Sequence, residues 1–166
     1  MSTTEIYAIE KNGDVKAYES ARNSWLGAMH VWNFLSEKYD LGGSMMFGFK
    51  RVWKAFNAGV YKNYENVVLG STFDHAVVMK ENFDQLLISF KKYYAAHPES
   101  NFGQQIEVIE AMKEDENVIG VAWCQTSVVD DLWDYYNEGE DERIPYNIFK
   151  GEKHWDLFDN LVEDSK

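Results

Sequence analysis

The chain has 166 residues, 45% apolar and 16% aromatic, which is enough apolar surface for one domain with a core and too much for a disordered chain. Its formal net charge of −12 is lopsided, because residues 1–100 hold 11 basic and 11 acidic side chains whereas residues 101–166 hold 5 and 17. Such an acidic excess argues against direct binding to nucleic acid and against docking on anionic lipid, since phosphates would be repelled.

The cysteine content and the lack of long apolar runs bear on where the protein resides. Cys124 has no second cysteine to pair with, so disulfides within the chain do not hold the fold. No run approaches the roughly 18 apolar residues that a membrane helix needs. Residues 1–14 show no basic stretch followed by an apolar core, as a secretory signal would. We therefore expect a cytoplasmic protein of one domain, residues 1–166, without membrane association.

The first third of the chain predicts a hairpin followed by two helices. Strand-forming residues 6–9 and 15–18 flank Asn12-Gly13, a pair typical of a tight turn with two positive φ angles. Apolar side chains then recur at helical spacing and predict helices over about 23–39 and 44–59. Three basic side chains lie on the polar side of the second helix: Lys50, Arg51 and Lys54.

The middle of the chain predicts two strands separated by two helices. Residues 75–79 (HAVVM) and 118–124 (VIGVAWC) are typical of buried strands, whereas residues 82–96 carry apolar side chains at helical spacing. A second helix follows Pro98 and is capped by Ser100 or Asn101. This order allows a parallel crossover between the strands, which would be right-handed.

The C-terminal part predicts two further helices. From Ser127 to Gly139 the apolar side chains form one stripe, with Val128, Val129, Leu132, Trp133 and Tyr136. A last helix is expected from about Glu152, with Trp155, Phe158, Leu161 and Val162 on one face. The whole pattern predicts an α+β fold in which a small sheet of about four strands, the N-terminal hairpin and two more, is packed by five or six helices.

Motifs with a specific chemistry are absent. The sequence holds no phosphate-binding glycine loop, no HExxH and no CxxC. His75 next to Asp74, and His154 near Asp156, lack a third ligand at a recognised spacing. We therefore expect no metal site and no cofactor.

A small hydrolase-like enzyme is one alternative function. His75 could act as the base for the Cys124 thiol if their strands are neighbours. Asp130 and Asp134 would supply further acid–base groups near the strand ends. The competing interpretation of these residues is a buried thiol and acids on a solvent-facing helix.

The leading hypothesis comes from the acidic stretch DDLWDYYNEGEDE. We expect a small acidic interaction or regulatory protein whose C-terminal third, about residues 127–166, binds a basic surface of a partner protein. A more specific form of this hypothesis is that the protein is a nucleic-acid mimic or inhibitor, with carboxylates in place of phosphates. Such a role would suit an accessory protein of a phage or mobile element. The predicted partner-binding residues are Asp130, Asp131, Asp134, Glu138, Glu140, Asp141 and Glu142.

The acidic stretch also has two plainer interpretations. The charge could serve solubility alone, and exposed aromatic side chains could instead make the protein a structural subunit of a homo-oligomer. The electrostatic hypothesis fails if the protein's own cations neutralise the carboxylates, and the cations to examine are Lys50, Arg51, Lys54 and Lys62.

Overall fold

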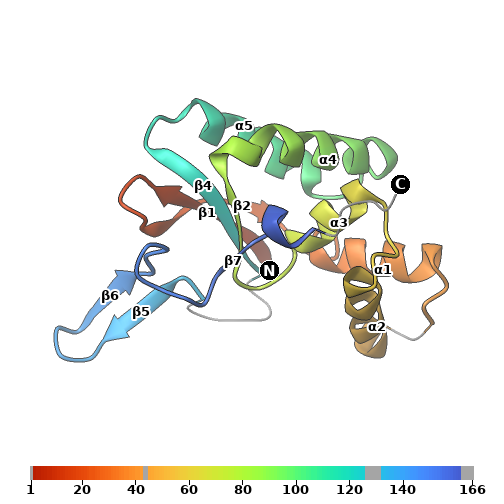
Figure 1. Cartoon of the computed structure of the whole chain (residues 1–166), viewed down its shortest axis with the longest axis horizontal. Helices are drawn as coiled ribbons and strands as arrows, with labels where there is room; N and C mark the ends of the chain where they lie inside the picture. Colours follow the sequence, from red (N-terminus) through yellow and green to blue (C-terminus); the bar gives the residue numbers. More distant parts are fainter. Residues whose placement is uncertain (1, 43–44, 126–131, 162–166) are drawn as a thin grey trace.

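The structure, a computed structural model, describes residues 2–42, 45–125 and 132–161. Its centre is a five-stranded mixed sheet with strand order β2-β1-β4-β3-β7, and a separate hairpin, β5–β6, projects from the body (Figure 1). The strands are β1 (Thr3–Glu10), β2 (Val15–Arg22), β3 (Ala76–Met79), β4 (Val118–Gln125), β5 (Asp134–Asn137), β6 (Glu142–Pro145) and β7 (Trp155–Asp156). The predicted α+β class is confirmed, with one strand more in the main sheet than expected.

Helices cover one face of the sheet. They are α1 (Ala28–Lys38), α2 (Met45–Asn57), α3 (Asn63–Gly70), α4 (Phe83–Ala96) and α5 (Phe102–Glu114). Four of them were predicted, although α1 begins five residues later than expected because Ser24 and Trp25 have positive φ angles. None of the helices in the described part of the chain has the length and apolarity needed to cross a bilayer.

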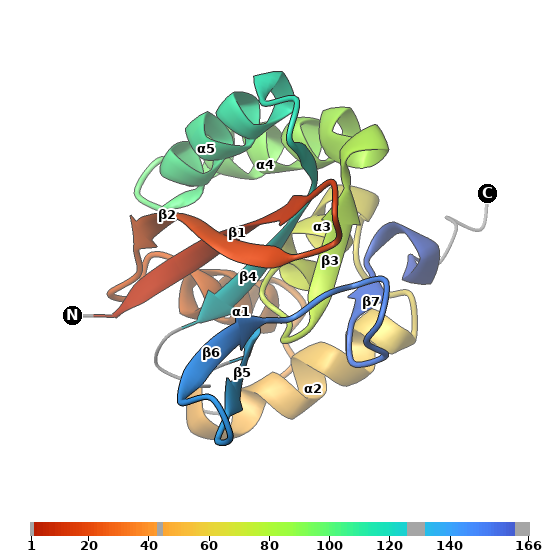
Figure 2. The ribbon, with the colours of Figure 1, turned by 90° about the vertical axis from the view of Figure 1, so that its left-hand side faces the viewer.

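The sheet separates two apolar cores. Val78 and Val121 belong to the larger core, which the helices share, whereas their neighbours Val77 and Ala122 belong to a smaller core on the other face. This alternation follows from strand geometry, in which successive side chains point to opposite faces. Leu132, Trp133 and Tyr146 cover the second face, whereas Leu157, further along the chain, belongs to the larger core on the helical side. The hairpin β5–β6 and strand β7 are both drawn in blue in Figure 2.

The N-terminal hairpin is confirmed, but its turn differs from the predicted type. Gly13 has a φ of +87°, whereas Asn12 is not in the left-handed region. The Asn12 side chain accepts a hydrogen bond from the backbone N–H of Asp14 at 3.0 Å. The turn is therefore stabilised by this side-chain hydrogen bond and does not need a second positive φ angle. Asparagine side chains readily form such a hydrogen bond with the backbone two residues further along.

The parallel crossover that the order of elements allowed between β3 and β4 does not occur. The two strands pair antiparallel, with Val77 opposite Ala122. Two helices, α4 and α5, connect them, and each helix reverses the direction of the chain. After two such reversals the chain enters β4 at the end where β3 finished, which makes the pair antiparallel.

Both helices predicted for the C-terminal part are corrected by the structure. Residues 126–131 lie outside the described residues, but Asp134–Asn137 forms strand β5, with Tyr135 opposite Ile144 of β6. In place of the last helix, Trp155 and Asp156 form β7, which pairs parallel with β3. The backbone N–H groups of Trp155 and Leu157 donate to the carbonyls of His75 and Val77 at 3.0 and 2.9 Å. Backbone pairing with the free edge of β3 therefore decides the conformation of residues 155–157, although the apolar side chains from Trp155 onward have helical spacing.

Helix α3 was not predicted, because it has no polar face. Residues 65–70 are all buried, so the sequence lacks the amphipathic spacing that marks a surface helix. Its one charged side chain, Glu65, accepts hydrogen bonds from Lys38, from the Tyr39 hydroxyl at 2.5 Å and from the backbone N–H of Lys62 at 3.0 Å. These three donors allow a carboxylate to sit inside the core.

Candidate functional site

The hairpin β5–β6 carries five of the seven predicted partner-binding residues. Asp134 opens β5 and is half-buried, whereas the other four acids lie in the exposed turn and the start of β6: Glu138, Glu140, Asp141 and Glu142. Between Asp134 and Pro145 the sequence holds five carboxylates and one guanidinium, a net charge of −4. Asp130 and Asp131 lie outside the described residues.

Hydrogen bonds within the hairpin order its turn. The Tyr136 hydroxyl donates to Asp141, and the backbone N–H of Gly139 donates to the side-chain oxygen of Asn137 at 3.1 Å. Asp141 has a φ of +51°, a conformation that aspartate tolerates better than most residues. The carboxylates are therefore presented by an ordered two-stranded arm.

Apolar side chains are exposed beside the carboxylates. Tyr135 and Tyr136 are 48% and 58% exposed, and Ile144 on the partner strand is 41% exposed. Phe149, which follows the hairpin, is 63% exposed. Aromatic residues are enriched in protein interfaces, because they bury a large area at a small loss of conformational freedom. The hairpin thus combines a charged rim with apolar side chains that a partner could cover.

The base of the hairpin is anchored in the smaller core. Trp133 and Tyr146 flank the hairpin and are almost fully buried, and the backbone N–H of Tyr146 donates to the Trp133 carbonyl at 2.7 Å. The indole N–H of Trp133 donates to the Trp123 carbonyl of β4 at 2.9 Å. Lys153 donates to the Leu132 carbonyl at 2.6 Å. A fixed base and an exposed tip make the hairpin a rigid projection rather than a loose loop.

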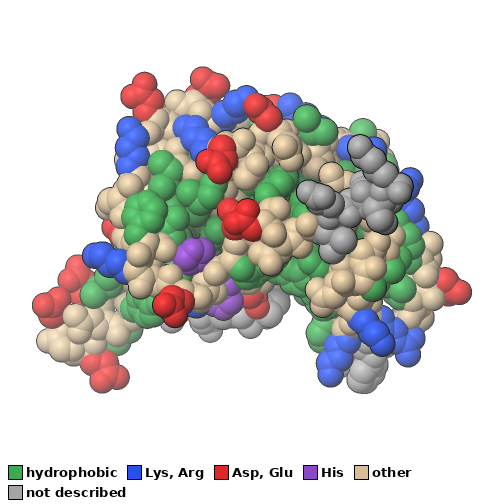
Figure 3. Space-filling view, in the orientation of Figure 1, with side chains coloured by type: hydrophobic (Ala, Val, Ile, Leu, Met, Phe, Trp, Pro, Cys, Tyr) green, Lys and Arg blue, Asp and Glu red, His purple; other side chains and the backbone are tan. Residues whose placement is uncertain are grey.

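The cations on α2 and next to α3 do not neutralise the hairpin. Among the described residues, Lys50, Arg51, Lys54 and Lys62 are exposed and form no ion pair with any carboxylate of the hairpin. Arg51 donates instead to the Leu41 carbonyl at 2.8 Å. Figure 3 shows acidic side chains over the hairpin at the lower left and a group of basic side chains at the lower right, where α2 lies.

Two cations do lie close to the hairpin. Arg143 on β6 is 3.6 Å from the Asp134 carboxylate. Lys153 stands over the rings of Tyr135 and Tyr146, at 4.6 and 4.7 Å from their centroids, and burial lowers its pKa. Arg143 therefore pairs with Asp134 at the start of β5, whereas the carboxylates of the turn remain exposed to solvent.

The predicted catalytic residues are spread over three strands or strand ends. His75 immediately precedes β3, with a φ of +65°, and its Nδ1 has no hydrogen-bond partner among the described residues. Cys124 is buried on the adjacent strand β4. Burial, and then Lys153, lower the pKa of His75, so this ring is neutral at pH 7. Asp134 belongs to the hairpin, and Asp130 lies outside the described residues, so the enzymatic alternative stays a prediction.

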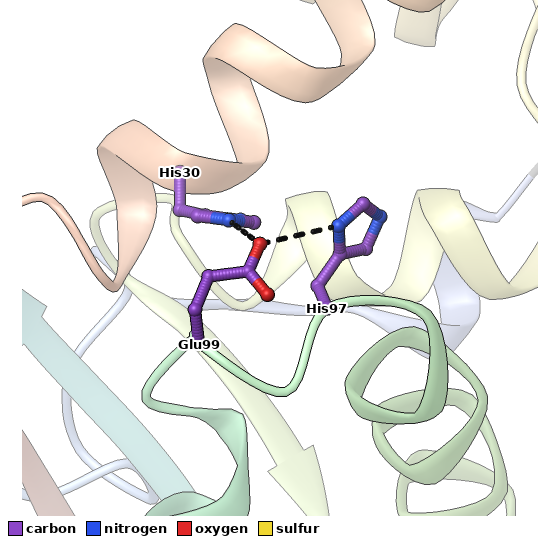
Figure 4. Close-up of side chains that lie close together, drawn as sticks. All are labelled: His30, His97 and Glu99. Carbon is purple, nitrogen blue, oxygen red and sulfur yellow. Dashed lines mark hydrogen bonds and ion pairs between the residues drawn. The ribbon is translucent and has the colours of Figure 1, made fainter.

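A further cluster joins residues that the sequence analysis did not connect. His30 projects from α1, and His97 and Glu99 come from the loop between α4 and α5 (Figure 4). Glu99 Oε1 is 2.7 Å from His30 Nε2 and 3.6 Å from His97 Nδ1. The only local signal was the pair His97 and Glu99 on either side of Pro98, because His30 lies 69 residues before Glu99.

An aromatic pocket of about 490 Å³ forms another concave surface. Its walls include Trp32, Trp53, Phe73 and Trp155. The indole N–H of Trp32 donates to the Thr72 hydroxyl at 2.9 Å, and that of Trp155 donates to the Asp74 carbonyl at 3.1 Å. The polar groups of these two indoles are thus satisfied internally, and the pocket presents apolar ring faces.

Comparison of the chain with protein-family models, with curated proteins and with solved structures found no match.

Proposed function

We propose that the protein is a small binding protein whose hairpin β5–β6 docks on a basic surface of a partner protein. The observation that carries the proposal is the projection of four exposed carboxylates, Glu138, Glu140, Asp141 and Glu142, next to exposed Tyr135 and Tyr136. A negative field steers a basic partner toward the hairpin, and the tyrosines supply area to bury after the encounter.

The distribution of charge on α5 supports this location over the other acidic part of residues 101–166. On α5, Glu110 pairs with Lys91 of α4 at 2.6 Å, and Lys113 pairs with Asp84 of α4 at 2.6 Å. Opposite charges are therefore interspersed on the helical face, which weakens the field there. The hairpin has one cation, Arg143, for five acids.

The first test is affinity capture from a lysate of the source cells with two variants of equal charge. The hairpin-neutral variant carries Glu138→Gln, Glu140→Gln, Asp141→Asn and Glu142→Gln. The body-neutral variant carries the same number of amide substitutions at exposed acids elsewhere: Glu81, Glu107, Glu114 and Glu116. Each variant changes the net charge from −12 to −8, so solubility and bulk charge are matched.

The proposal predicts that the wild type and the body-neutral variant retain the same basic protein and that the hairpin-neutral variant loses it. Equal retention by all three chains would contradict the proposal. Adding a nucleic-acid duplex to the retained complex tests mimicry, because a mimic occupies the nucleic-acid site and is displaced by the duplex. If the duplex does not reduce retention, the hairpin binds a basic surface other than the nucleic-acid site, and mimicry is contradicted.

A further inference from the structure

The geometry of His30, His97 and Glu99 points to a second site, and we propose that it binds one divalent transition-metal ion of the zinc class. The ligand atoms would be Nε2 of His30, Nδ1 of His97 and a carboxylate oxygen of Glu99. Imidazole nitrogen and carboxylate oxygen are donors that Zn²⁺ prefers, whereas Ca²⁺ and Mg²⁺ take oxygen ligands.

The spacing of the three donors suits such an ion. The Glu99 oxygen lies 2.7 Å from one ring nitrogen and 3.6 Å from the other, and all three atoms lie within 4.8 Å of one another. With metal–ligand bonds of about 2.0–2.1 Å, the ligands of a tetrahedral ion are about 3.3 Å apart. The two shorter separations bracket this value, so small side-chain rotations would suffice to admit the ion.

The rings are held in place by their surroundings. His97 packs against Phe34 and Tyr93, with ring centroids 4.4 and 4.6 Å apart. His30 Nδ1 lies 2.7 Å from the hydroxyl of Tyr93, which is almost fully buried. A phenol oxygen can accept from Nδ1–H, and this leaves the Nε2 lone pair for the metal. Tyr93 thus occupies the position of the outer partner that metal-binding histidines usually have.

The site is open on one side. The side chains of His30 and His97 are 17% and 19% exposed, whereas that of Glu99 is 55% exposed. An ion can therefore enter past Glu99, and its fourth position faces solvent. Three protein ligands with one open position is the arrangement in which zinc takes a water molecule or an external ligand, as opposed to a closed structural site with four protein ligands.

The test is a titration of the chelator-treated full-length chain with Zn²⁺ by calorimetry and with Co²⁺ by absorption spectroscopy. Glu99→Gln replaces the anionic carboxylate ligand by a neutral amide on an exposed loop, and His97→Phe removes a ligand nitrogen while keeping the ring stacking. Tyr93→Phe removes only the hydroxyl behind His30. Glu107→Gln is the control, since it removes an exposed acid from α5, outside the cluster. Thermal unfolding without metal checks that each variant is folded.

We expect one ion per wild-type chain, unaffected by excess Ca²⁺, and an affinity at least about tenfold lower in Glu99→Gln and His97→Phe. Tyr93→Phe is expected to lower the affinity by about tenfold, and Glu107→Gln to leave it unchanged. Failure of the wild type to bind Zn²⁺ would overturn the inference. Equal binding by the two ligand variants would overturn it too, because the ion would then sit on other carboxylates.

Discussion

Glu65 shows how a single buried carboxylate can be stabilised by its surroundings. Its side chain is fully buried in α3, and burial alone would raise its pKa. Hydrogen bonds from Lys38, Tyr39 and the backbone N–H of Lys62 more than offset this effect, so the pKa of Glu65 lies below its usual value. The ionised form is therefore favoured more in the folded chain than in the unfolded chain.

Replacing Glu65 by glutamine should destabilise the fold in a pH-dependent way. Because its folded pKa is lowered, the ionised Glu65 contributes stability above its unfolded pKa of about 4.3, and this contribution is lost as the pH falls through the folded value. We expect Glu65→Gln to lower the free energy of unfolding by about 2–3 kcal/mol at pH 7. In urea unfolding, the difference from wild type should shrink below about pH 4. A difference independent of pH would contradict this account.

Tyr136 tests whether an aromatic side chain contributes to the proposed interface. It is 58% exposed, and its removal creates no cavity in the core. We expect Tyr136→Ala to weaken binding of the captured partner by about 1–2 kcal/mol with little change in stability. Tyr136→Phe, which loses only the hydrogen bond to Asp141, should weaken binding less. Tyr18→Ala on β2 removes another exposed tyrosine and is the control. Equal affinities of the two variants, measured by calorimetry, would show that charge alone mediates the contact.

The helices and strands could be predicted where the local spacing of apolar and turn residues favours the same structure as the packing in the folded chain. Asn12-Gly13 between two strand-forming runs marks the N-terminal hairpin, and the apolar stripe of residues 83–96 marks α4. Both patterns have a buried face and an exposed face in the structure. For these elements the sequence pattern and the packing lead to the same structure.

The C-terminal elements could not be predicted because tertiary contacts decide them. Leu132, Trp133 and Tyr136 fit a helical stripe, yet Trp133 enters the smaller core while Tyr136 lies on an exposed strand. Trp155 fits another stripe, yet its backbone completes the edge of β3. The candidate metal cluster was not predicted for a similar reason, because His30 and Glu99 are distant in the sequence and become neighbours only in the folded chain.

The residue that follows the short strand β7 anchors it in the larger core. Leu157 is fully buried and packs against Gly70 of α3, where an added Cβ would lie 2.0 Å from a Leu157 methyl carbon. We expect Leu157→Ala to lower the free energy of unfolding by about 2–5 kcal/mol and to speed hydrogen exchange at the amide of Trp155. Ile88→Ala on the exposed face of α4 should stay within about 0.5 kcal/mol of wild type. Unchanged exchange at Trp155 would contradict the role of Leu157.

At the scale of the whole molecule, the acidic excess of residues 101–166 is divided in space. Part of it lies on α5, where Lys91 and Lys113 intervene, and part of it projects on the hairpin. The sequence shows the charge asymmetry and the acids of residues 134–142, but the hairpin that presents these acids was not predicted. A projecting arm concentrates the field at one end of the molecule, while the cations of α2 lie elsewhere (Figure 3).

The dissociation constant of the captured partner, measured for the wild type, the hairpin-neutral variant and the body-neutral variant at two salt concentrations, tests this account most directly. We expect the hairpin-neutral variant to bind at least about tenfold more weakly than the other two at about 0.1 M salt. This gap should narrow at about 0.5 M salt, because the Debye length shortens. Three equal dissociation constants, or a gap that does not depend on salt, would contradict an electrostatic hairpin.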